Sequence, residues 1–163
     1  MDVDRSAVYG AELVAFDGTD LESVVGLERI GARLHAVAAG EWWPGPLIDV
    51  RAARADARSS TTRCATAQTD GRAVIRFAAT QATIATAAHE LAHALAGVDA
   101  GHGPLFRAAY LDIVGVITNV ETTDRRHDLH VDQLAAAFDD ARLPIGERRW
   151  PPPPASTTGA IAL

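Results

Sequence analysis

The chain has no lysine, so all fifteen of its basic residues are arginine. Its single cysteine, Cys64, excludes an internal disulfide and a cysteine-based zinc finger. No apolar run approaches the length that spans a membrane. The acidic N-terminal segment also lacks the charged-then-apolar layout of a secretion signal. These absences predict a cytoplasmic, soluble protein with no membrane partner.

Excess positive charge is also missing. The formal net charge is −6 and the isoelectric point is about 5.4, which argues against broad electrostatic binding of nucleic acid by the chain as a whole. A length of 163 residues suits one domain with its own core. We expect that domain over residues 1–145. The proline-rich segment 146–163 is expected to be a disordered tail.

Apolar periodicity predicts an α+β fold in which a small sheet packs on one central helix. The sheet is expected to be three-stranded and mainly antiparallel, with a polar run at residues 59–62 and a turn at residues 69–72 between its strands. Its strands are predicted at residues 47–50, 63–67 and 73–77. Helices are predicted at residues 4–16, 21–39, 80–96, 104–120 and 126–141.

The most informative motif is His89-Glu90-Leu91-Ala92-His93 in the central predicted helix. Histidines four residues apart share one face of a helix, so both imidazoles reach a single metal ion. Glu90 lies slightly off that face, where it can act as general base toward a water that the metal activates. With a third nitrogen from His102, one position stays open, as in catalytic zinc sites. The motif predicts one Zn²⁺ per chain on His89, His93 and His102.

The third ligand has alternatives. Asp99 falls six residues after His93, where another zinc-protease pattern places its ligand, but that pattern needs glycine at the position of Ala96. We therefore favour His102, whose flanking glycines allow a tight turn. Acidic residues farther along, Asp112 and Glu121, are weaker candidates. A second metal at His127, Asp128 and His130 is less expected than an exposed helix start.

His89 to His93, followed by His102-Gly103-Pro104-Leu105-Phe106, resembles the SprT-like zinc metallopeptidases. A longer resemblance, over most of residues 7–120, is to HExxH metallohydrolases of actinobacteria and their bacteriophages. Val8-Tyr9-Gly10-Ala11-Glu12 belongs to it. The resemblance implies a zincin-like fold, a zinc cofactor on His89, His93 and His102, and Glu90 as the catalytic base. The chain lacks the cysteine zinc ribbon and basic tail of relatives that act on DNA-crosslinked proteins.

The function expected from these residues is that of a zinc metallopeptidase acting on a protein or peptide substrate. A sheet edge beside the site would bind an extended peptide by strand addition. The alternative is a non-catalytic, zinc-stabilised module that binds a partner or regulates it. The sequence leaves the substrate and the oligomeric state open.

Overall fold

The fold is α+β, with five helices and one three-stranded sheet in the described part of the chain. A computed structural model describes residues 2–64, 66–119 and 126–154, except the side chains of residues 126–128. The helices are α1 (Arg5–Phe16), α2 (Leu27–Ala39), α3 (Ile84–Ala96), α4 (Pro104–Asn119) and α5 (Arg126–Asp140). The strands are β1 (Ile48–Ala52), β2 (Thr61–Arg63) and β3 (Ala73–Phe77).

The sheet is mixed, so the expected mainly antiparallel sheet is wrong. Its order is β1-β3-β2: β1 runs parallel to β3, and β2 runs antiparallel to β3 on the other side. β3 takes the centre because it is the most buried strand. The connection through residues 53–72 is long enough for the crossover that a parallel pair requires. Both β1 and β2 are therefore edge strands.

The start of the second strand was also misplaced. β2 occupies Thr61–Arg63, so it begins inside the polar run 59–62 that is expected to separate two strands and ends at the first residue of the predicted strand 63–67. Threonine is β-branched and favours the extended conformation, and this local preference outweighs the polarity of the run.

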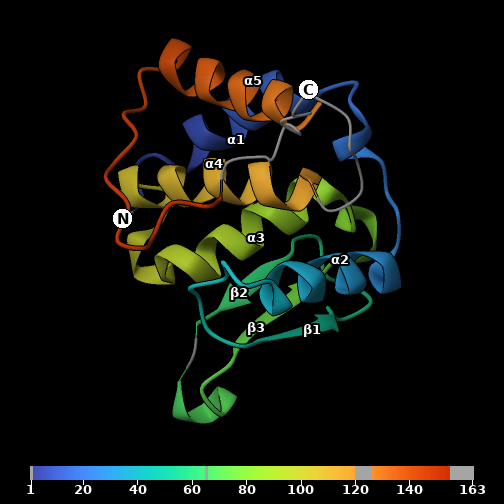
Figure 1. Cartoon of the computed structure of the whole chain (residues 1–163). Coiled ribbons are helices and arrows are strands. Elements are labelled where there is room, and N and C mark those ends of the chain that lie inside the picture. Colours follow the sequence, from blue (N-terminus) through green and yellow to red (C-terminus); the bar gives the residue numbers. More distant parts are fainter. Residues whose placement is uncertain (1, 65, 120–125, 155–163) are drawn as a thin grey trace, which may run out of the picture.

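α3, α4 and α5 lie in successive layers above the sheet, whereas α2 lies level with it (Figure 1) and packs against β1. α3 lies between the sheet and α4, and α5 packs on both α4 and α1. The core between them is apolar and closed, and each fully buried large side chain contributes about 1.5–3 kcal/mol through the hydrophobic effect. Its largest apolar members are Phe16, Phe106, Phe138, Ile30, Leu34, Ile75, Leu91, Ile113, Ile117 and Leu134. None of the helices in the described part of the chain is long and apolar enough to cross a membrane.

Two predicted helices begin later than expected, for one shared reason. Val24 forms an antiparallel bridge with Thr83, and the Val25 amide donates to the Ala82 carbonyl at 2.9 Å. Both segments are therefore extended just before α2 and α3. Gly26, with a φ of +89°, turns the chain into α2. Thr83 caps α3, because its Oγ1 accepts a hydrogen bond from the Thr86 amide at 3.1 Å.

The first part of the C-terminal segment, residues 146–154, contacts the helical body. Arg148 donates two hydrogen bonds to the buried carboxylate of Asp112, at 2.6 and 2.8 Å. Trp150 donates a third, at 2.9 Å. The indole of Trp42 donates to the carbonyl of Pro151. Residues 155–163 lie outside the described residues, and the domain boundary at residue 145 stays a prediction.

Candidate metal site

Three histidines converge between α3 and the start of α4. One ring nitrogen from each of His89, His93 and His102 lies within 4.8 Å of the other two. The Nε2 atoms of His89 and His102 are 3.1 Å apart. Two nitrogens bound to one tetrahedral zinc at about 2.0–2.1 Å would be about 3.3 Å apart. The three residues could therefore hold a metal ion.

The local sequence explains how the three rings meet. His89 and His93 are one helical turn apart on α3, which places both on one face. Gly97, with a φ of +86°, ends the helix, and Gly101, with a φ of +53°, turns the chain back toward it. An L-residue adopts such angles only with strain. Gly101 is one of the two glycines that flank His102, and the tight turn expected there returns His102 to the helix.

Two carboxylates bind the Nδ1 atoms of His89 and His102, the ring nitrogens that face away from the centre of the cluster. The Nδ1 of His89 is hydrogen-bonded to Glu12 on α1, and the Nδ1 of His102 is hydrogen-bonded to Asp2. Histidines that bind metals usually donate their second N–H to a carboxylate or carbonyl in this way, which fixes the tautomer and the ring orientation. Both Nε2 atoms are consequently left facing each other.

A buried arginine fixes the turn that carries His102. Arg107 is fully buried and donates to the His102 carbonyl at 2.8 Å and to Asp4 Oδ2 at 2.9 Å. Its Nε donates to the Pro144 carbonyl at 2.8 Å. Since a charge buried this deeply must be paired, Arg107 holds the N-terminal segment, and so Asp2, beside the third histidine.

Aromatic rings pack around the histidines and limit their rotation. Phe106 contacts all three imidazoles, with ring centroids 4.4 to 5.0 Å away. Tyr9 stacks on His89 at 5.3 Å with an interplanar angle of 7°. The apolar contact explains why the Nδ1 atom of His93 is buried without a hydrogen-bond partner. A buried polar atom without a partner is costly unless a water molecule or an ion satisfies it.

The surroundings give the three histidines different protonation behaviour. Burial, followed by repulsion from His89 and His102, lowers the pKa of His93 to about 3. Burial also lowers the pKa of His102, although Asp2 opposes it. Burial acts in the same sense on His89, but the charge and hydrogen bond of Glu12 outweigh it and raise the pKa. His93 and His102 are thus neutral at pH 7, the form that binds metals.

Glu90 points from α3 toward the sheet. Its Oε2 accepts a hydrogen bond at 2.6 Å from the hydroxyl of Thr62 on β2, and the same hydroxyl lies 2.9 Å from the Glu90 carbonyl. The residue is only 6 % exposed. Burial raises the pKa of the Glu90 carboxyl, against the lowering effects of His89 and Thr62. A carboxylate whose pKa is raised toward neutrality is a better general base.

The competing ligands lie elsewhere. Asp99 is exposed on the turn η4 (Val98–Ala100) and is not part of the group. Asp112 is engaged by Arg148 and Trp150. Glu121 and the side chains of residues 127 and 128 lie outside the described residues, whereas the ring of His130 faces Phe16 at 6.4 Å. Within the described residues the three histidines form the one group suited to a metal.

Sequence reasoning missed Glu12, Asp2 and Thr62. Glu12 carried a signal: it is spaced four residues from both Val8 and Phe16, which are fully buried, so it stands on the apolar side of its helix. A carboxylate in that position requires a partner. Asp2 and Thr62 carry no comparable signal, because their contacts to His102 and Glu90 span long stretches of chain.

Comparison with known protein families, with curated proteins and with solved structures finds no match for this chain. The geometry of the site therefore has to carry the functional argument.

Proposed function

We propose that this protein is a zinc-dependent metallohydrolase, and more specifically a metallopeptidase. The observation that carries the proposal is the convergence of His89, His93 and His102, with Glu90 on the same helix. Three imidazoles favour zinc among the common metals of hydrolases, and they leave a position open for water. The carboxylate partners of His89 and His102 support a site built for a cation.

The residues suit a hydrolytic mechanism. A bound zinc ion supplies Lewis acidity, which lowers the pKa of water and polarises a carbonyl group. Glu90 takes a proton from the attacking water and delivers it to the leaving amine. Thr62 holds the Glu90 carboxylate at one oxygen. Glu12 fixes the imidazole of His89, and Asp2 fixes that of His102. The two rings therefore need little reorganisation during the reaction.

A zincin-like arrangement is part of the proposal. α3 carries the motif and packs beside β2, an edge strand that is antiparallel to its neighbour. Thr62, in the middle of β2, contacts the motif glutamate directly. An extended peptide paired to this edge would pass next to Glu90, which agrees with strand addition as the binding mode.

The burial of the site favours a second candidate function, a zinc-stabilised module without catalysis. His89, Glu90 and His102 are only 4 to 6 % exposed, and structural zinc sites are typically closed. Glu90 distinguishes the two candidate functions, because a metallopeptidase needs it as general base and a purely structural zinc site does not.

The first experiment measures metal content by elemental analysis in protein purified without added metal. We expect about one zinc per chain in the wild type, a loss in His102→Ala, and wild-type content in Asp99→Ala. Asp99 serves as the matched control because it neighbours His102 in sequence but lies outside the cluster. A wild-type protein that binds no metal even when zinc is supplied would refute both candidates.

The second experiment tests hydrolysis of a peptide library by wild type and Glu90→Gln. The isosteric glutamine keeps the shape of the side chain but cannot accept the proton. We expect Glu90→Gln to bind zinc normally and to lose activity by about 100-fold or more. Equal activity in the two proteins would remove Glu90 from the mechanism. Zinc binding with no hydrolysis of any peptide would favour the structural module.

A further inference from the structure

Six of the fifteen arginines gather on the open face of the sheet and the loops beside it. They line two adjoining clefts together with three aspartates, Asp49, Asp70 and Asp99. This region is therefore positive, although the whole chain has a net charge of −6. The arginines are Arg51, Arg54, Arg58, Arg63, Arg72 and Arg76.

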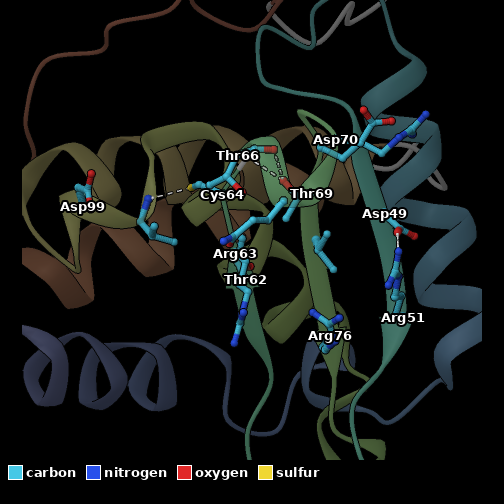
Figure 2. Close-up of a pocket in the computed structure, with 14 residues that line it drawn as sticks. Asp49, Arg51, Thr62, Arg63, Cys64, Thr66, Thr69, Asp70, Arg76 and Asp99 are labelled. Atoms are coloured by element: carbon cyan, nitrogen blue, oxygen red, sulfur yellow. Dashed lines mark hydrogen bonds and ion pairs between the residues drawn. The ribbon is translucent and has the colours of Figure 1, made fainter.

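The larger cleft has a volume of about 840 Å³, and Figure 2 shows arginines of all three strands along it. Strand register sets Arg51 directly beside Arg76. Like charges that face each other across strands are destabilising. Arg51 is paired with Asp49. In the described part of the chain, no carboxylate is paired with Arg63, Arg72 or Arg76. The fold thus keeps unpaired positive charge in a concave surface.

β2 connects this cleft to the candidate metal site. Thr62 and the next residue, Arg63, both line the cleft, and the hydroxyl of Thr62 also reaches Glu90 on α3. β2 is an edge strand. Among the described residues, the backbone of Thr61–Arg63 makes no hydrogen bond other than those to β3. A strand paired to this edge would lie beside both Glu90 and the arginines.

We propose that the cleft selects acidic side chains of an extended peptide that binds along β2. The proposal rests on the peptidase function and names its substrate class: a protein segment with acidic residues next to the bond that is cleaved. Guanidinium groups bind carboxylates with paired hydrogen bonds. Alternate side chains of a strand share one face, so acidic residues at every second position would all meet the arginines.

The lining favours a peptide over a nucleic acid. Three aspartates lie among the arginines. They would repel a phosphate backbone, which carries a charge at every nucleotide, more than a peptide whose acidic residues alternate with neutral ones. No aromatic side chain lines either cleft, whereas proteins that bind single strands without sequence preference stack bases on aromatic rings.

The test uses the zinc-loaded Glu90→Gln variant, which should bind a peptide without cleaving it, and measures fluorescence anisotropy of labelled decapeptides. One peptide alternates glutamate with threonine, and the other carries glutamine in place of every glutamate. We expect the acidic peptide to bind at least about tenfold more tightly, with an affinity that falls as salt rises. Equal binding of both peptides would overturn the proposal, as would tighter binding of single-stranded oligothymidylate.

Charge reversal locates the binding surface. Arg63→Glu and Arg72→Glu, each added to Glu90→Gln, should weaken binding of the acidic peptide by about tenfold and leave the glutamine peptide unaffected. Arg149→Glu is the matched control, because Arg149 is also exposed but does not line either cleft. A similar loss of affinity in Arg149→Glu would mean that net charge explains the effect, and it would refute the cleft as the binding site of the acidic peptide.

Failure of this inference is distinguishable from failure of the proposed function. If the wild type cleaves neutral and acidic peptides equally well, the peptidase function stands and the acidic selectivity falls. If the acidic peptide binds through Arg63 but is never hydrolysed, the cleft stands as a binding surface and the peptidase function falls.

Discussion

The candidate metal site and the open face of the sheet differ in how their charged and polar side chains are paired and exposed. At the candidate metal site, His89 and His102 are buried, and each is hydrogen-bonded to a carboxylate, Glu12 for His89 and Asp2 for His102. On the sheet face, Arg63 and Arg72 are exposed, and no carboxylate of the described residues is paired with them. One region is organised before any ligand arrives, whereas the other presents charge to solvent.

This difference follows from the cost of burial. A polar group removed from water must be hydrogen-bonded or it destabilises the fold, so the histidine site requires partners from distant parts of the chain. Exposed guanidinium groups remain hydrated and interact weakly with each other through solvent. Single substitutions should therefore matter greatly at the metal site and little for stability on the sheet face.

Removal of the metal should have the largest effect on stability of all the changes considered for the two regions. Free zinc at about a thousand times its dissociation constant should stabilise the fold by about 4 kcal/mol. For a chain of this length, that corresponds to a rise in Tm of roughly 10 °C. Differential scanning fluorimetry of chelator-treated protein, with and without added zinc, measures it.

Variants from the two regions should respond differently to zinc. His93→Ala should show no rise in Tm, because one of three nitrogens is lost. Arg63→Glu should rise as much as the wild type, since Arg63 lines the cleft and does not belong to the histidine cluster. An equal rise in His93→Ala and wild type would mean that zinc binds elsewhere.

The carboxylate partners of the histidines provide the next test. Glu12→Gln should lower zinc affinity by about 10–100-fold, because the residue orients His89 and raises its basicity. Asp2→Asn should have a smaller effect, since the side chain of Asp2 is 31 % exposed against 15 % for Glu12 and solvent screens its charge. Competition with a chromophoric chelator measures both affinities.

A matched control separates orientation from charge alone. Asp17→Asn removes one negative charge from an exposed position just after α1 and should leave zinc affinity unchanged. If Asp17→Asn weakened binding as much as Glu12→Gln, general electrostatics rather than the hydrogen bond to His89 would explain the effect.

The sequence predicted local features of the molecule well. Spacing within one helix was sufficient to pair His89 with His93, and the glycines that flank His102 correctly indicated a turn that returns the chain to that helix. The bounds of α4 were correct to within one residue, because a proline at its first turn and a regular apolar stripe mark it clearly.

Long-range features could not be predicted in this way. The parallel pairing of β1 with β3 depends on which strand is most buried, a property of the assembled core. The bridge between Val24 and Thr83 joins segments far apart in the chain, and because of it α2 and α3 begin later than their local sequence predicts. The contacts of Asp2 and Thr62 have the same character. Periodicity describes neighbours in sequence and contains no information about such pairs.

Thr62 belongs to β2, which borders both regions, and it gives the smallest predicted effect. Its hydroxyl donates to Glu90, and this bond lowers the pKa of the glutamate. Thr62→Val should therefore raise that pKa. Because the proposed base acts only when ionised, the acidic limb of kcat/KM should move to higher pH, with a loss of about tenfold below neutrality. Zinc affinity should not change, and Thr62→Ser, which keeps the hydroxyl, should restore the profile. A pH profile that is identical in Thr62→Val and wild type would mean that the strand does not tune Glu90, and it would leave the sheet and the metal site without a chemical connection.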